Sequence, residues 1–435
     1  MKVRTHIFGI LLISISALAG PNWPQWRGPT GDGVSSAVKL PETWSENEGL
    51  RWKCALPEWG NSTPAVWGDA IFLTAHLDGK TLQLLRIDKS TGQLVWSRTV
   101  GEGQAVVETR PGGGRGSARF HKDHNLASPS PVTDGEIVAV HFGNGDLATY
   151  DFAGKELWKR NLVADHGPYT TWWGRANSPV LHKDLVISVC MQDSCEDILE
   201  TPSPSYVVAH HRLSGKQAWK TMRTTGAKRV AGDSYITPVF RQVDYQVEMI
   251  VAGGGWLDAY APETGERRWY IPGLSGYELA RNPVLADGMI FMGQARRSAL
   301  TALRPKGEGE LGVDAIVWRF GYAAWNAPSP VIWKGKIYMA DNNGIINCID
   351  MHSGKKLWRA RLRGNYRSSP IAADDRIYFL STDGLCTILA AGDRFDKLAE
   401  NTLDSETYAS PAIAGDCILV RGRKWLYCIG PKPIP

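Results

Sequence analysis

One short pattern recurs eight times along the chain and limits what it can fold into. Each copy has a small polar residue, then Pro, a few apolar residues, a turn and a second apolar run, as in "STPAVWGDAIFLTA" and "SSPIAADDRIYFLS". The spacing of about 40 to 67 residues fits one four-stranded antiparallel blade per copy. The pattern therefore predicts an all-β, eight-bladed β-propeller. The repeated prolines are Pro64, Pro131, Pro179, Pro238, Pro283, Pro330, Pro370 and Pro411.

A Trp marks the second half of most copies. Segments such as "YDFAGKELW" and "HHRLSGKQAW" predict a strand, a tight turn at Gly and a returning strand that presents the indole. An outer strand needs a large apolar side chain against the neighbouring blade, so we interpret these indoles as structural docking residues. The seventh copy has Ala399 at this place. The docking residues are Trp52, Trp96, Trp158, Trp219, Trp269, Trp318 and Trp358.

The eighth copy stops at "KWLYCIG", before any outer strand. The segment "GLRWKCAL" near the N-terminus contributes Trp52 with no inner strands before it. An N-terminal strand that completes the last blade would remove the open edge of the propeller. We therefore predict that the propeller spans residues 49–435 and that its N-terminal strand closes the ring.

The run of a polar residue, Thr/Ser-Gly and then Trp resembles the tryptophan-docking motif of pyrroloquinoline-quinone-type (PQQ-type) propellers. That superfamily includes quinoprotein alcohol dehydrogenases and outer-membrane assembly-factor lipoproteins. The head "NWPQWRGP" further resembles exported PQQ-like repeat proteins of uncharacterised role. The resemblance covers Trp23 to Gly430 and implies the propeller fold. It leaves function open, because one scaffold hosts both catalysts and binding modules.

The N-terminus predicts export. Lys2 and Arg4 precede an apolar run, and a small-residue cleavage site follows, so residues 1–19 are predicted to be a signal peptide. No Cys follows the cleavage site, so we expect no lipid anchor, and no later segment is long enough to span a membrane. The formal charge of +5 gives no case for nucleic-acid binding. We expect a periplasmic or secreted protein, most simply a monomer.

The segment "NWPQWRGPTGDGVSS" is too rich in Pro and Gly for a helix or a central strand. We interpret residues 20–48 as an irregular clasp over the propeller surface near the final blade. In this hypothesis Trp23 and Trp26 dock into an apolar groove and Arg27 binds a carboxylate.

The four strands of a blade are named A to D from the channel outward. Loops from B to C and from D to the next blade open on the same face, so three long loops are predicted to gather there: residues 97–127, 161–177 and 191–205. Residues just before each Pro should then line the mouth of the central channel. Their mixture of Arg, Asn and aromatic groups suits a polar, anionic or carbohydrate-like ligand. The alternative is that they solvate a wet channel and pair with one another. They are Asn61, Asn125, Arg175, Asn177, Tyr235, Glu278, Arg281, Asn326, Arg367 and Tyr408.

The sequence offers no motif for catalysis or metal binding. His121, Asp123, His124 and His166 match no established metal spacing, so no metal site is predicted. PQQ and calcium are conceivable cofactors, with Glu278 or Asp233 as base. The vicinal cysteines of the alcohol dehydrogenases and a C-x-x-C-H haem motif are missing, however, so neither cofactor is supported.

Seven cysteines in an exported chain leave at least one unpaired. Cys417 with Cys428, across a hairpin, and Cys190 with Cys195 are candidate disulfides. The function favoured by the sequence is a non-catalytic binding or scaffolding module with a protein partner or a polar small molecule at the channel mouth. The alternatives are a PQQ-dependent alcohol or sugar dehydrogenase and a carbohydrate-binding propeller.

Overall fold

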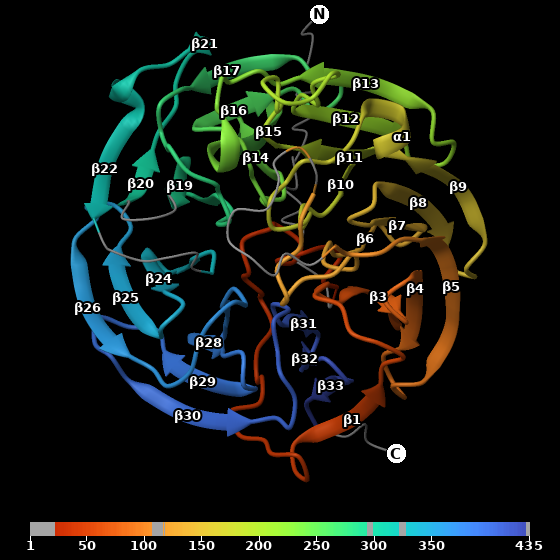
Figure 1. Ribbon diagram of the computed structural model, residues 1–435. Helices are drawn as coiled ribbons and strands as arrows, with labels where there is room; N and C mark the ends of the chain where they lie inside the picture. The colour runs from red at the N-terminus through yellow and green to blue at the C-terminus, as the bar shows by residue number, and fades with distance from the viewer. Residues whose placement is uncertain (1–21, 107–115, 117, 294–298, 322–327, 432–435) are drawn as a thin grey trace, which may run out of the picture.

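The computed structural model describes residues 22–106, 116, 118–293, 299–321 and 328–431 (Figure 1). The predicted signal peptide and the candidate residue Asn326 lie outside these residues. Eight antiparallel four-stranded units are arranged in a ring, one of them extended by a fifth strand, which confirms the predicted eight-bladed propeller. Within each blade the strands are hydrogen-bonded in order from the channel outward. The helical elements described are α1 (Leu162–His166), η1 (Arg229–Ala231) and η2 (Val313–Ala315).

The first four blades follow one another along the chain. Blade 1 contains β2 (Ala65–Trp67), β3 (Ala70–Leu77), β4 (Thr81–Asp88) and β5 (Leu94–Glu102). Blade 2 contains β6 (Val132–Thr133), β7 (Ile137–His141), β8 (Asp146–Asp151) and β9 (Glu156–Asn161). Blade 3 contains β10 (Val180–His182), β11 (Leu185–Cys190), β12 (Tyr206–His211) and β13 (Gln217–Met222). Blade 4 contains β14 (Val239–Val243), β15 (Gln246–Gly253), β16 (Trp256–Tyr260) and β17 (Arg267–Ile271).

The remaining blades complete the ring. Blade 5 contains β18 (Val284–Ala286), β19 (Met289–Gly293), β20 (Ala299–Leu303) and β22 (Ile316–Gly321). Blade 6 contains β23 (Val331–Trp333), β24 (Lys336–Ala340), β25 (Ile345–Asp350) and β26 (Lys356–Arg361). Blade 7 contains β27 (Ile371–Ala373), β28 (Arg376–Leu380), β29 (Leu385–Ala390) and β30 (Lys397–Thr402). Blade 8 contains β31 (Ala412–Ala414), β32 (Cys417–Arg421), β33 (Trp425–Ile429) and β1 (Leu50–Ala55).

Two connections depart from the simple repeat. The N-terminal strand β1 pairs antiparallel with β33, so the two ends of the chain close blade 8 as predicted. The longer excursion in blade 5 forms β21 (Gly309–Glu310), which pairs in parallel with β17 and adds a fifth strand to blade 4. The excursion thereby covers the outer edge of its neighbour, where an unpaired strand would be open to pairing with another chain.

Most docking Trp side chains join one blade to the next. The indole nitrogen donates a hydrogen bond to a carbonyl in the following blade, at 2.8 Å for Trp52 and Trp158 and 3.1 Å for Trp96, Trp219, Trp318 and Trp358. Trp269 is the exception and donates to the Glu248 carboxylate of its own blade, since blade 5 replaces the Gly turn by the excursion.

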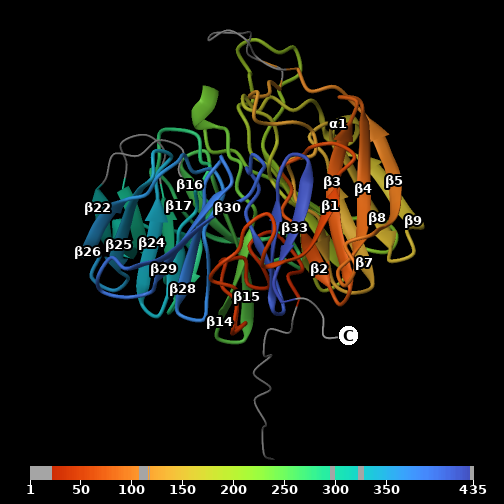
Figure 2. The same cartoon turned by 90° about the horizontal axis from the view of Figure 1, so that it is seen from below.

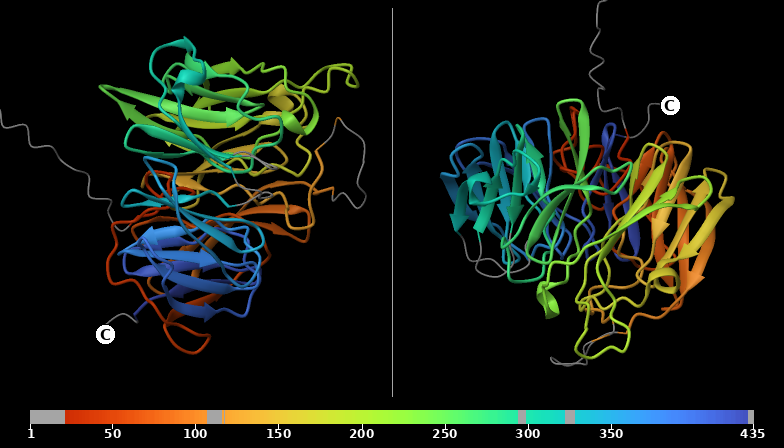
Figure 3. Two further views of the ribbon diagram at one scale, coloured as in Figure 1. Left: turned by 90° about the vertical axis from the view of Figure 1, so that its left-hand side faces the viewer. Right: turned by 90° about the horizontal axis from the view of Figure 1, so that it is seen from above.

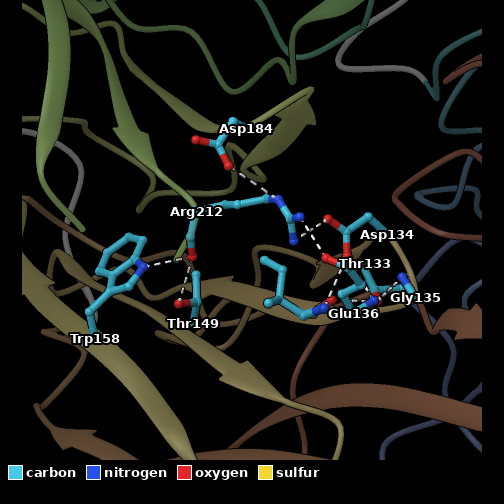
Figure 4. A network of polar contacts seen from close by, with 9 residues as sticks. Thr133, Asp134, Gly135, Glu136, Thr149, Trp158, Asp184 and Arg212 are labelled. Carbon is cyan, nitrogen blue, oxygen red and sulfur yellow. Dashed lines mark hydrogen bonds and ion pairs between the residues drawn. The ribbon is translucent and has the colours of Figure 1, made fainter. Parts of the chain in front are cut away.

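The Trp158 contact shows how such a joint is built (Figure 4). Its indole packs against Gly215, whose φ of +67° and lack of a side chain let the ring approach. The carbonyl of Arg212 accepts hydrogen bonds from Trp158 and from the Thr149 hydroxyl. The Arg212 guanidinium in turn lies 2.6 Å from Glu136 of blade 2. One residue at the turn of blade 3 therefore ties the two blades by its backbone and by its charge.

Residues 22–36 lie in the channel and not over the surface near the final blade, which corrects the predicted position of this part of the segment. Residues 22–36 form a channel plug that crosses the centre of the ring (Figure 1). Trp23 exchanges two backbone hydrogen bonds with Val66 of blade 1, and Gly33 accepts one from Ala372 of blade 7. The Asn22 side-chain oxygen accepts a hydrogen bond from Gly68 N–H in the turn between β2 and β3, so the plug enters from the face opposite to the long loops (Figure 2).

Arg27 shows the second difference from the predicted clasp. Its guanidinium donates to the backbone carbonyls of Asp32, Ser329 and Pro330, and not to a carboxylate. The side chain is buried, and burial lowers the pKa of Arg27 to about 10. The two carbonyls of Ser329 and Pro330 therefore hold the plug at blade 6, whereas the Asp32 carbonyl lies within the plug itself.

The chain beyond the plug compensates for the missing Trp of blade 7. Trp44 is buried in the same hydrophobic cluster as Ala399, with its backbone N–H bound to Asn401 of β30 at 2.9 Å. The cluster contains side chains of blades 1, 7 and 8. An indole supplied from the N-terminal segment thus lies at the blade whose own docking position is an Ala.

Candidate functional site in the central channel

A closed ring of hydrogen bonds surrounds the channel, made by the small polar residue that precedes each repeated Pro. In seven steps around the ring, the backbone N–H of one such residue donates to the side-chain oxygen of the next, at 2.9 to 3.1 Å. The Thr63 hydroxyl closes the circle on the carbonyl of Ser410. The repeated polar-Pro pattern therefore encodes a channel ring, which consists of Thr63, Ser130, Ser178, Thr237, Asn282, Ser329, Ser369 and Ser410.

A cavity of about 360 Å³ lies on this ring. Six hydroxyl residues of the channel ring line it, and Trp26 of the channel plug lies among them. The long loops gather on the opposite side from the plug, as the views from below and above show (Figures 2 and 3). The plug therefore covers one end of the channel, and the cavity faces the side of the long loops.

Five of the ten predicted mouth residues line this channel cavity. They are Asn61, Tyr235, Glu278, Arg367 and Tyr408. Because they come from the loops that enter blades 1, 4, 5, 7 and 8, the topology brings together residues far apart in the sequence. The shared position just before the channel ring was the signal that located them.

The other predicted residues are elsewhere. Asn125 caps its own turn, accepting from Ala127 N–H and donating to the Trp59 carbonyl. Asn177 donates to the carbonyls of Ser234 and Ile236, which joins blades 3 and 4. Arg175 is buried over the Tyr169 ring at 4.6 Å, and Arg281 is buried beside Gly293. These four do not line the cavity, because they sit behind its wall and hold the blades.

Trp26, Trp173, His121, Asp123 and His124 line the channel cavity although none was predicted as a ligand-binding residue. The adjacent Trp172 and Trp173 in a long loop were a usable signal. Trp26 could not be found in this way, because only the folded plug brings it into the channel.

The loop before blade 2 forms one polar wall. Asn61 donates to the Asp123 carbonyl at 2.6 Å, and the His121 ring lies 3.3 Å from the Asp123 carboxylate. His121 also meets the Trp173 ring edge-on, with centroids 5.6 Å apart. His124 is bound to the Ser128 hydroxyl, and burial lowers its pKa to about 4, so it is neutral at pH 7.

Two buried acids, Asp233 and Glu278, come from the loops that enter blades 4 and 5. Asp233 accepts a hydrogen bond from the Trp172 N–H at 2.8 Å and lies 3.4 Å from the Tyr235 hydroxyl. Burial raises the pKa of Asp233 to about 7 despite these bonds. Glu278 is only 2 % exposed, and its Oε2 accepts no hydrogen bond from any described residue. Glu278 lines the cavity, whereas Asp233 lies behind it.

The residues present do not fit a PQQ and calcium site. Among the described residues no group of three His, Cys, Asp or Glu side chains could hold a metal ion. PQQ carries three carboxylates, but the cavity wall offers Asp123 and Glu278 against the single guanidinium of Arg367. The two carboxylates in the lining repel such an anion. The chain also lacks adjacent cysteines to press on a quinone.

Neither candidate disulfide is formed in the structure, where all seven cysteines are described and free. The register of β32 and β33 puts Cys428 opposite Leu419 and not Cys417. The hairpin turns one residue later than expected, which makes the two thiols diagonal neighbours. Their contact and burial raise the pKa of the Cys417 thiol.

The fold and its Trp joints define a class of protein, the PQQ-type propellers. A family model described as "Outer membrane protein assembly factor BamB" matches residues 43–201 and 310–422, more than half of the chain. The chain therefore belongs to this PQQ-like propeller family.

Individual relatives agree with this assignment. The outer membrane protein assembly factor BamB of Burkholderia pseudomallei is 22% identical over 391 residues, covering 85% of this chain and 84% of that protein. The crystal structure of BamB from Moraxella catarrhalis has a TM-score of 0.60 at 12% identity, covering 87% of this chain and 99% of that one. Quinohemoprotein alcohol dehydrogenase from Comamonas testosteroni has a TM-score of 0.66 at 13% identity, covering 97% and 82%. At these identities the solved structures establish the fold alone. The described residues include no helix with the length and apolar character needed to cross a membrane.

Proposed function

We propose that this protein is an exported, non-catalytic binding module that takes a polar ligand, or polar groups of a partner, in the channel cavity. One observation carries the proposal: a cavity of about 360 Å³ is covered at one end by the plug and lined by aromatic and polar side chains. Concave sites with apolar walls and a few polar groups are the usual form of ligand pockets. Half-buried Trp173, Tyr235 and Tyr408 supply the apolar surface.

Relatedness supports binding over chemistry. The relative from Burkholderia pseudomallei is named as an assembly factor, which favours a protein partner and a periplasmic location beside the outer membrane. A PQQ-dependent dehydrogenase remains the alternative from a different class. The carboxylates of the cavity and the single lining guanidinium disfavour it, because they do not match a quinone tricarboxylate.

Ligand-dependent thermal unfolding tests the proposal. The purified chain is titrated with neutral sugars, carboxylates, amines and short peptides, and each is also assayed for dye reduction with PQQ and calcium. A ligand at 100 times its Kd stabilises the folded state by about 2.7 kcal/mol. With an unfolding entropy of about 2.1 cal/mol/K per residue, this raises the Tm of a chain of 435 residues by about 3 °C.

Two matched variants make the result specific. Trp173 lines the cavity, whereas its neighbour Trp172 does not. At least one ligand class should stabilise the wild type and Trp172→Ala but not Trp173→Ala. The proposal is wrong if no class gives this difference, or if quinone-dependent turnover of an alcohol or sugar is observed.

A further inference from the structure

We infer that the ligand of the channel cavity is a neutral saccharide, held as one or two pyranose rings with a ring hydroxyl donating to Glu278. This inference rests on the proposed binding function and adds its chemical class. It follows from four properties of the cavity: its aromatic surface, its balance of charge, its unused hydrogen-bonding groups and its size.

The aromatic surface comes from four separate segments. Trp26 lies in the channel plug, Trp173 in the loop before blade 3, Tyr235 before blade 4 and Tyr408 before blade 8. All four side chains are half-buried, so each has surface left for a ligand. A pyranose ring has an apolar C–H face with polar edges, and amphipathic aromatic rings match such a surface.

The cavity lining carries charges of both signs, two carboxylates and one guanidinium, so it favours no strongly charged ligand of either sign. The carboxylates of Asp123 and Glu278 would repel an anion such as the quinone. A cation would meet the guanidinium of Arg367 and would lie close to buried Arg27, whose guanidinium is 5.7 Å from the centre of the Trp26 ring. Arg27 is cationic at pH 7 even with its lowered pKa. A neutral ligand avoids both repulsions.

The hydrogen-bonding groups left over suit a polyol. Glu278 is almost fully buried at the wall, yet its Oε2 has no donor among the described residues, which makes it an acceptor in need of a hydroxyl. The hydroxyls of the channel ring supply hydrogen-bond donors. Each hydroxyl of the channel ring that accepts a backbone N–H still has its own O–H to donate. Those that line the cavity are Ser130, Ser178, Thr237, Ser329, Ser369 and Ser410.

The size limits the number of sugar units. A volume of about 360 Å³ is near the lower end of the range of about 300 to 1,000 Å³ for small-molecule sites. Such a volume admits one or two pyranose rings within the channel and leaves further units of a longer chain outside the mouth.

Isothermal titration with a sugar panel tests the inference. The panel contains glucose, galactose, mannose, N-acetylglucosamine, maltose, cellobiose, lactose and N,N′-diacetylchitobiose, with glucuronate and glucosamine as charged comparators. We expect saturable one-to-one binding of a neutral member with a Kd of about 10 μM to 1 mM. The matching charged comparators should bind at least about tenfold more weakly.

Variants tie the binding to the named groups. Glu278→Gln keeps the shape but weakens the acceptor, and Trp173→Ala removes an aromatic wall. Each should weaken the sugar at least about tenfold, while Trp172→Ala should stay within about twofold. Tyr408→Phe, which loses only a hydroxyl, provides a variant expected to fold normally, and circular dichroism checks the fold of all four.

The outcomes separate this inference from the proposed function. The saccharide assignment is overturned if no neutral sugar binds up to about 10 mM, or if binding is indifferent to Glu278→Gln and Trp173→Ala. If another ligand class then binds in a Trp173-dependent way, only the saccharide class is wrong. If no class does, the proposed binding function is wrong as well.

Discussion

Removal of one indole from the channel plug is the sharpest test of the plug's structural role. Trp23 is 1 % exposed, packs against Gly28 and belongs to the core cluster of blades 1, 7 and 8. Trp23→Ala should therefore carry the full cost of a buried Trp-to-Ala change, about 3 to 5 kcal/mol. At about 2.1 cal/mol/K per residue, the unfolding entropy of the 435-residue chain is about 0.9 kcal/mol/K, so the Tm should fall by about 3 to 6 °C.

Differential scanning calorimetry of the purified chain measures this shift. Trp26→Ala is the matched control, because Trp26 is half-buried at the cavity and should cost far less stability. Arg27→Met should lower the Tm as well, since it leaves buried carbonyls of Ser329 and Pro330 without their charged donor. An unchanged Tm in Trp23→Ala would refute the reasoning, because the plug would then lie in the channel without stabilising the fold.

Three further predictions concern the blades and the buried acid. Because burial raises the pKa of Asp233 from 3.8 to about 7, the folded state holds a proton that the unfolded state releases, and stability falls as pH rises between these values. Asp233→Asn should lack this loss. Urea unfolding at pH 4 and pH 8 measures it: between these two pH values the free energy of unfolding of the wild type should fall by at most about 4 kcal/mol more than that of the variant. Gly215→Ala should lose about 1 to 3 kcal/mol, because a Cβ would lie 2.6 Å from the Trp158 ring; an unchanged urea midpoint would contradict this joint. Ala399→Trp should lower the free energy of unfolding of the wild type, and it should lower that of Trp44→Ala by less. Additive losses in a double-mutant cycle would show that the two side chains do not share a site.

The candidate site was only partly visible in the sequence. The position before each Pro located Asn61, Tyr235, Glu278, Arg367 and Tyr408 at the cavity, because the repeat fixes where every blade meets the channel. The same rule failed for residues whose side chains point away from the cavity, namely Asn125, Arg175, Asn177 and Arg281. Sequence position gives the place of a backbone, whereas the direction of a side chain depends on the blade packed against it.

The sequence also gave no sign of the hydrogen bonds between neighbouring blades. The small polar residues before Pro were recognised as repeat markers, but their mutual bonds around the channel ring depend on eight segments meeting at one radius. The register of the last hairpin shows the same limit. A turn displaced by one residue puts Cys417 diagonal to Cys428 instead of directly opposite it, and no pattern in "CILVRGRKWLYC" distinguishes the two turns.

The sequence by itself determined the architecture: eight copies give eight blades, and a missing last strand requires one from the N-terminus. These conclusions need only periodicity and the rule that sheet edges are covered, both of which are local or countable. Only the tertiary structure decided the path of residues 22–36, because a Pro- and Gly-rich segment has no periodic pattern to assign its partners. The closed ring leaves a channel. Burial of Trp23 in the cluster of blades 1, 7 and 8, and of Arg27 against the carbonyls of Ser329 and Pro330 in blade 6, fixed the plug there and with it one end of the channel.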